Sequence, residues 1–111
     1  MKVGLIRCLQ TEAICPARGC ISVMSSRIGA FGGIEEEIIL TGVNTCGGCP
    51  GKNAVPRATR MVEQGADAIA FSTCVTKGAP VDFSCPHQEQ MIEAVRKSVG
   101  PDIKIFEYTH D

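Results

Sequence analysis

The sequence predicts an α/β fold in which a four-stranded parallel sheet is covered by helices on both faces. Three observations predict it. Short aliphatic segments alternate with helical patterns, the short segments are apolar throughout, and glycine follows each helical pattern. Strands that are apolar on both faces are typical of buried parallel sheets. We therefore expect a single flavodoxin-like or Rossmann-like βαβαβαβ domain over residues 1–111, with strand order 2-1-3-4.

Four short segments rich in aliphatic side chains are typical of strands: Lys2–Arg7, Glu37–Val43, Asp67–Ser72 and Ile103–Tyr108. Between them, three groups of apolar residues recur at helical spacing and are expected to pack on the sheet. These groups are Ile21, Met24 and Ile28; Val55, Ala58, Met61 and Val62; and Met91, Ile92, Val95 and Val99. The residues expected to end the three helices are Gly29, Gly65 and Gly100.

Composition narrows the class of protein. The chain carries 11 basic and 12 acidic side chains, a net charge of −1, and no basic run, so we expect no nucleic-acid partner. The first apolar run is interrupted at Arg7, which makes it too short for a signal peptide or a membrane span. We therefore expect a cytoplasmic protein with no membrane contact. Seven cysteines in a reducing compartment favour metal binding or redox chemistry over disulfides.

Cysteine and histidine residues follow the ends of the predicted strands. Cys8, Cys46 and Cys74 come after the first three strands, and Cys49 stands close behind Cys46. His110 follows the fourth strand. Because the carboxyl ends of parallel strands meet at one edge of a sheet, we expect these side chains to gather there.

Three further positions point to the same edge. Cys15, Cys49 and Cys85 each precede a proline, which suits the first position of a helix. We expect each of these cysteines to cap a helix, where the helix dipole favours the thiolate. His87 is placed in the first turn of the third helix, and Cys20 one turn into the first helix. All seven cysteines and both histidines are thus expected at or near one edge.

The same residues carry a resemblance. The stretches "IRCLQTE", "ICP", "TCGGCPGK", "GADAIAFSTCVTKGAP", "CPH" and "YTH" occur in this order over nearly the whole chain. With them the sequence resembles the CGGC domain family, small proteins with a central Cys-Gly-Gly-Cys. The resemblance implies a metal-binding role, with zinc as the ion. Carried over by position, the Cys/His set of the family falls on Cys8, Cys15, Cys20, Cys46, Cys49, Cys74, Cys85, His87 and His110.

Three hypotheses stay open at this point. Zinc binding is the first, because thiolate and imidazole are the usual zinc ligands. Nine donors exceed one tetrahedral site, so two ions, or one ion with free thiols, are both allowed. An iron–sulfur cluster held by four cysteines is the second hypothesis, although the spacing matches no common ferredoxin run. A thiol–disulfide redox protein using Cys46 and Cys49 is the third.

A small anion is a further expectation at this edge. Lys52 follows the stretch "CGGCPG", a glycine-rich loop entering a helix, although the spacing is not that of a P-loop. The stretch "STCVTKGAP" adds the hydroxyls of Ser72, Thr73 and Thr76 and the amine of Lys77. A phosphate or carboxylate beside the metal fits these groups. No general base with a matched partner stands out, and we assign no reaction.

Overall fold

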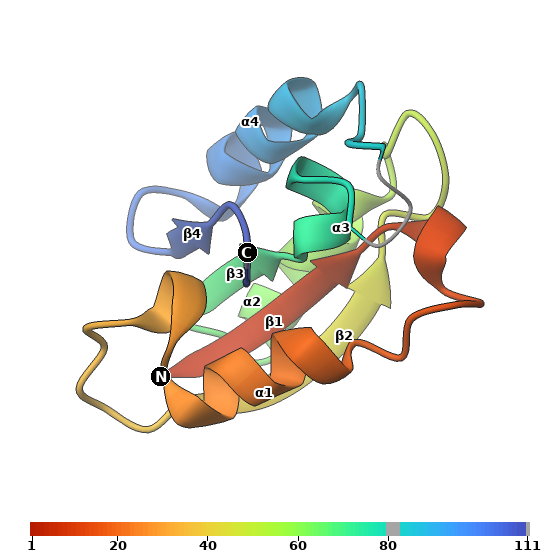
Figure 1. The fold of residues 1–111 in the computed structure, drawn as a ribbon. Coiled ribbons are helices and arrows are strands. Elements are labelled where there is room, and N and C mark those ends of the chain that lie inside the picture. Colours follow the sequence, from red (N-terminus) through yellow and green to blue (C-terminus); the bar gives the residue numbers. More distant parts are fainter. Residues whose placement is uncertain (80–82, 111) are drawn as a thin grey trace.

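The computed structural model describes residues 1–79 and 83–110. At its centre lies a four-stranded parallel sheet with the order β2-β1-β3-β4, which confirms the predicted arrangement (Figure 1). The strands are β1 (Lys2–Arg7), β2 (Ile39–Thr45), β3 (Ala68–Phe71) and β4 (Lys104–Phe106). The first strand has the predicted bounds. The second lies further along the chain than predicted, and the third and fourth are shorter than predicted.

Helices cover both faces of the sheet. α1 (Arg18–Ser26) lies on one face, and α2 (Ala54–Glu63) and α4 (Gln88–Val99) pack together on the other (Figure 1). The short helix α3 (Thr73–Thr76) follows β3 almost directly. Two 3-10 turns, η1 (Leu9–Thr11) and η2 (Gly29–Phe31), complete the described elements. None of the described helices is long and apolar enough to cross a membrane.

Apolar side chains fill the space on both sides of the sheet. Successive residues of a strand point to opposite faces, so Leu5 packs toward α1 and Ile6 packs toward α2 and α4. On the α1 side the rings of Phe31 and Phe106 lie with their centroids 4.5 Å apart. On the α2 and α4 side Phe71 is the one aromatic ring among the buried described residues, and the rest of that cluster is aliphatic or sulfur-bearing.

The sequence prediction for the first helix is partly wrong. It places Ile21 and Ile28 on the buried face, but both side chains are exposed. Arg27 adopts a left-handed conformation, with φ of 55°, and the helix ends before Ile28. The buried residues of α1 are Cys20, Val23 and Met24. The face that meets the sheet is therefore rotated, and it carries a thiol into the core.

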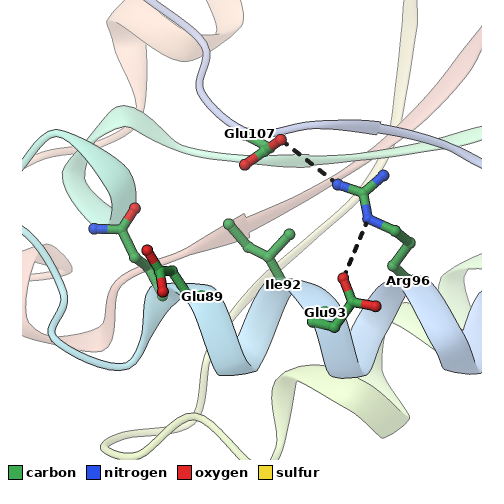
Figure 2. Close-up of a pocket in the computed structure, with 6 residues that line it drawn as sticks. Glu89, Ile92, Glu93, Arg96 and Glu107 are labelled. Carbon is green, nitrogen blue, oxygen red and sulfur yellow. Dashed lines mark ion pairs between the residues drawn. The ribbon is translucent and has the colours of Figure 1, made fainter.

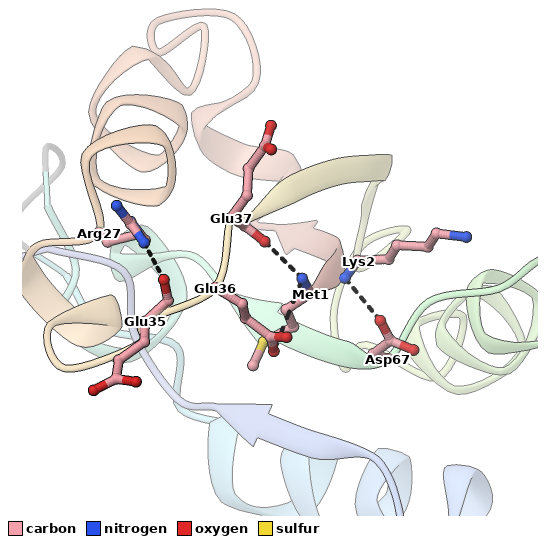
Figure 3. Close-up of polar contacts among 7 residues, drawn as sticks. All are labelled: Met1, Lys2, Arg27, Glu35, Glu36, Glu37 and Asp67. Atoms are coloured by element: carbon pink, nitrogen blue, oxygen red, sulfur yellow. Dashed lines mark hydrogen bonds and ion pairs between the residues drawn. The ribbon is translucent and has the colours of Figure 1, made fainter.

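The amino edge of the sheet is held by charged groups and backbone. The amino group of Met1 donates to the carbonyl of Glu37 over 2.6 Å, and the amide of Lys2 donates to the carboxylate of Asp67 over 2.9 Å (Figure 3). Arg27 donates to a backbone carbonyl in the same region. These contacts fix the start of β1 between its two neighbours. The thiols that follow the strands lie at the opposite edge.

Candidate metal centre

The exits of the first three strands each carry a cysteine. Cys8 follows β1, Cys46 follows β2, and Cys74 lies in α3 just after β3. The amide of Cys46 donates to the carbonyl of Arg7 over 2.8 Å, so β1 and β2 stay side by side up to their cysteines. All seven cysteines are free thiols. Parallel topology therefore places these three sulfur-bearing residues at one edge, as the sequence predicts.

Four thiols belong to the apolar cluster between the sheet and α2 and α4, and we call Cys8, Cys46, Cys74 and Cys85 the α4-side thiols. Cys46 and Cys74 are 7% and 6% exposed, and the other two are partly buried against the cluster. Burial raises the pKa of the Cys8 thiol, and the neighbouring thiols of Cys46 and Cys74 raise it further. Charges interact in this way only when the groups lie close together.

Cys85 is tied to the same cluster from the start of α4. Burial raises the pKa of its thiol, the amide of His87 donating over 3.3 Å lowers it, and the thiols of Cys49 and Cys46 raise it. Cys46 is thus a shared neighbour of Cys8 and Cys85. The prediction that a helix start favours the thiolate is wrong at Cys85, because burial outweighs the single N–H donor.

The remaining donors on the other face, Cys15, Cys20 and His110, we call the α1-side donors. Cys20 is 4% exposed, and its Sγ lies 3.1 Å from Oγ1 of Thr109. Burial raises the pKa of Cys20, while hydrogen bonds from Thr109 and from the amide of Thr73 lower it. The carbonyl of Cys15 accepts a hydrogen bond from the guanidinium of Arg7. That bond ties the loop before α1 to the end of β1.

His110 packs against the first turn of α1. A Cβ added at Gly19 would lie 3.1 Å from Nε2 of His110, so the imidazole rests on the helix where glycine leaves room for it. The amide of His110 donates to Oγ1 of Thr73 over 2.8 Å, and its carbonyl accepts from the same hydroxyl over 2.6 Å. Although it is the penultimate residue, His110 has its backbone fixed next to Cys20.

The three cysteine–proline pairs do not begin helices. The N-cap residues are Ala17, Asn53 and His87. Predictions that Cys15, Cys49 and Cys85 cap helices are therefore wrong, and so is the placement of His87 inside the first turn. The backbone of the loops before α1 and α2 explains why these two helices start beyond the proline. Ala17 has φ of 68° and Gly51 has φ of 87°, and residues in this left-handed region interrupt a helix before it can start at the proline.

Buried hydroxyls at this edge are the residues that sequence reasoning misses. Thr73 and Thr109 bond to one another with their Oγ1 atoms 3.1 Å apart, and Oγ of Ser72 lies 2.9 Å from Sγ of Cys74. The sequence places Ser72 and Thr73 at this edge but assigns them to an anion. Thr109 receives no role. The feature of the sequence that could have pointed to Thr109 is its position between the last strand and His110.

The types of donor residue favour a metal site, whereas the arrangement of the described donors does not form one. Among the described residues, no three Cys, His, Asp or Glu side chains are arranged closely enough to hold a metal ion. Thiolate and imidazole nevertheless match the ligands of zinc. The structure places the α4-side thiols in one apolar cluster, and it places His110 against α1 beside Cys20. It leaves Cys49 exposed and His87 half-buried at the start of α4.

Several hollows lie along α4. One, of about 720 Å³, is lined in part by Cys85 and His87. Another, of about 280 Å³, lies between α4 and the end of β4 (Figure 2). There Arg96 lies 3.5 Å from the carboxylate of Glu107 and 3.8 Å from that of Glu93. Among the described residues, no Cys or His lines this second hollow, and its arginine is paired with carboxylates.

Comparison with known proteins identifies the family of the chain. The sequence profile of the CGGC domain matches residues 2–110, nearly the whole chain. The chain belongs to the CGGC domain family. Membership suggests a metal-binding role without naming the metal. It also confirms the resemblance on which the set of nine Cys and His positions was carried over.

Two relatives come from Methanocaldococcus jannaschii, and both bear the name of an uncharacterized protein. MJ0766 is 36% identical over 56 residues, which cover 50% of this chain and 80% of that protein. MJ0582 is 32% identical over 81 residues, which cover 67% of this chain and 62% of that protein. The match therefore spans less than two thirds of MJ0582. No solved structure matches the chain.

Proposed function

We propose that this CGGC domain binds a zinc ion through thiolates at the carboxyl edge of its sheet. The observation that carries the proposal is that four thiols belong to one apolar cluster at this edge. They come from four separate segments: the exits of β1 and β2, the helix α3, and the loop before α4. Zinc takes four thiolate or imidazole ligands in a tetrahedron. The α4-side thiols, Cys8, Cys46, Cys74 and Cys85, are the ligands that we assign first.

Five candidates remain beyond this set. Cys49 and His87 lie nearest to Cys85, so we assign them as alternatives for the fourth ligand. The α1-side donors are candidates for a second ion. The core on both faces of the sheet is apolar, so we expect the fold not to depend on the ion. This favours a role in sensing, delivery or catalysis over a purely structural one, and we name no reaction.

Elemental analysis tests the proposal on protein purified without oxygen and without a histidine tag. We expect about one zinc ion or more per chain, no visible absorption band, and release of the ion as an aromatic mercurial titrates the thiols. Iron with acid-labile sulfide and a brown colour would replace zinc by an iron–sulfur cluster. Metal-free protein with all seven thiols reactive would contradict metal binding.

Thiol–disulfide exchange through Cys46 and Cys49 is the second candidate function. Cys49 is exposed and Cys46 is buried, which suits an accessible thiolate that attacks and a second thiol that resolves the mixed disulfide. In that cycle the two thiols become a disulfide while a substrate disulfide becomes two thiols. Reduction of insulin disulfides that survives Cys8→Ser but not Cys49→Ser would support it. Protein that leaves insulin intact would contradict it.

Two finer expectations accompany the proposal. We infer a cytoplasmic location, because cysteines stay reduced there and all seven are free thiols. A small anion beside the metal stays a prediction. Lys52 is exposed, and Nζ of Lys77 lies 4.0 Å from the centroid of the Tyr108 ring, an arrangement that orients Lys77 toward an aromatic face.

A further inference from the structure

Thr73 connects the exit of β3 to the end of the chain. It is the first residue of α3 and is buried, and the end of the chain lies beside α3 (Figure 1). Its Oγ1 lies 2.8 Å from the amide nitrogen of His110 and 3.2 Å from that of Thr109. The carbonyl oxygen of His110 lies 2.6 Å away. One buried hydroxyl therefore meets three backbone groups where chain ends ordinarily fray.

Three backbone groups surround the Thr73 hydroxyl. A threonine hydroxyl has one proton to donate and two lone pairs to accept with. The carbonyl of His110 accepts the proton, and the amides of Thr109 and His110 donate to the oxygen. Oγ1 of Thr109 also lies 3.1 Å from Oγ1 of Thr73, and either hydroxyl can be the donor in that contact. The amide of Thr73 donates to Oγ1 of Thr109 over 3.3 Å, which fixes where that hydroxyl sits.

The sulfur of Cys20 lies 3.1 Å from Oγ1 of Thr109, and either atom can be the donor in that contact. On the same turn of α1, the imidazole of His110 rests on Gly19. The sulfur of Cys20 and the imidazole of His110 thus both depend on the segment that Thr73 holds. The backbone bond from Ala30 to the carbonyl of Thr109, at 3.0 Å, forms whatever side chain stands at position 109.

We infer that Thr73 is a positioning residue for the α1-side donors. Its hydroxyl fixes the backbone of Thr109 and His110, and through them it places the imidazole and the hydroxyl that meets Cys20. Binding of an ion by Cys20 and His110 rests on the proposed function, but their placement by Thr73 does not. The two claims can therefore be tested separately.

The chain offers closely matched variants. Thr73→Val removes the hydroxyl at nearly constant volume, and Thr73→Ser keeps it. Thr76→Val makes the same change elsewhere in α3, at a buried Oγ1 that has no hydrogen-bond partner. Thr109→Val removes the hydroxyl that meets Cys20 but leaves both backbone amides bonded to Thr73.

Amide hydrogen exchange, followed by NMR on the full metal-free chain, measures these contacts directly. In Thr73→Val we expect the amides of Thr109 and His110 to exchange at least about tenfold faster than in the wild type, with the amides of β3 unchanged. Thr73→Ser, Thr76→Val and Thr109→Val should stay within about threefold of the wild type. Equal rates in Thr73→Val and Thr76→Val would overturn the inference.

A folding failure leaves the inference testable. If Thr73→Val unfolds, the amides of β3 will exchange as fast as those of the chain end. The decision then rests on Thr73→Ser and Thr109→Val, which must both keep the protection at residues 109 and 110. Loss of that protection in either variant, with β3 intact, would show that the Thr73 hydroxyl does not hold the segment.

Zinc titration of the same variants separates the inference from the proposed function. If both hold, Thr73→Val weakens the response of the His110 imidazole resonances to zinc by about tenfold, and Thr73→Ser restores it. Faster amide exchange in Thr73→Val, together with His110 resonances that do not respond to zinc even in the wild type, keeps the positioning role and removes His110 from the ligands. A wild type that binds no zinc contradicts the proposed function, while the exchange result still decides the role of Thr73.

Discussion

Two groups of donors share the carboxyl edge of the sheet, and they are held by different forces. The α4-side thiols pack among apolar side chains, and Cys74 has a hydroxyl, that of Ser72, within 2.9 Å. On the other face, Cys20 and His110 are held by a network of hydrogen bonds that runs through Thr73. Packing gathers side chains without directing them, whereas hydrogen bonds fix individual atoms. The first group is therefore suited to close around an ion, and the second has a preset geometry.

Cys74, one of the α4-side thiols, also lies near the α1-side donors. Its thiol acts on the pKa of Cys8 on one side and on that of Cys20 on the other. The neighbouring residue Thr73 holds the end of the chain. Two consecutive residues at the exit of β3, Thr73 and Cys74, therefore interact with both groups of donors. A substitution at either position is expected to affect both groups.

The largest expected effect comes from removing a thiol at the centre of the α4-side group. Cys46→Ser should weaken zinc binding by more than about 100-fold, because changes outside the ligand shell already cost about 10–100-fold. Cys20→Ser is the matched control, since it is the same change at an equally buried thiol on the other face. Zinc competition against a chromophoric chelator measures both variants. Equal losses would contradict the assignment of the first ligands to the α4 side.

Removal of zinc from the wild type should have the next largest effect. A ligand that binds only the folded state at about 100 times its Kd stabilises that state by about 2.7 kcal/mol. We expect a chelator to lower the free energy of unfolding by about this amount, measured by urea denaturation. Because the apolar core is independent of the ion, the metal-free chain should still unfold in one cooperative step. Complete unfolding by the chelator would instead assign the ion a structural role.

The sequence predicts the features of this structure that follow from apolar patterns better than those that follow from local backbone conformation. Strand order and the exits at Cys8, Cys46 and Cys74 follow from alternating apolar segments, because a parallel sheet leaves few ways to connect them. The first residues of the helices are not predicted, because residues in the left-handed conformation, such as Ala17 and Gly51, move the helix starts further along the chain. No local sequence pattern predicts this conformation at Ala17. The metal assignment rests on residue type and not on an observed ligand geometry, so it too stays a prediction.

The hydroxyl network is beyond sequence reasoning for a different reason. Thr73 and Thr109 are separated by most of the second half of the chain, and their contact exists only once β3 and β4 are paired. A threonine is ordinary both in a loop and in a core, so neither residue stands out alone. His110 is predicted from its type, and the glycine that receives it, Gly19, is visible only in three dimensions.

Removing single hydroxyls should lower the free energy of unfolding by smaller amounts, and these amounts should differ between the two groups of donors. Thr109→Val leaves the buried amide of Thr73 with only the weakly accepting sulfur of Cys20 and should cost about 1–3 kcal/mol. Ser72→Ala removes a hydroxyl that meets only a weakly bonding thiol and should cost about 0.5–1.5 kcal/mol. Urea denaturation of the metal-free variants gives both values, provided the slope of the transition is unchanged. A larger loss at Ser72 would reverse the contrast.

The smallest effect is a pH dependence in the metal-free protein. Burial raises the pKa of the thiols of Cys8, Cys20 and Cys85 above the ordinary value of 9.0. As the pH rises past 9.0, the unfolded chain releases thiol protons that the folded chain still holds. The stability present below that pH is therefore lost as the pH rises through the folded pKa values.

Urea denaturation from about pH 7 to about pH 10 should show this fall in the free energy of unfolding. Other groups also titrate there, so the thiol contribution is the difference between the wild type and a cysteine variant. Cys20→Ser should flatten the curve more than Cys8→Ser, because Cys20 is buried and Cys8 is only partly buried. If the two variants flatten it equally, burial on the α1 side is not what sets the titration of Cys20, and its hydrogen bond to Thr109 offsets the effect of burial.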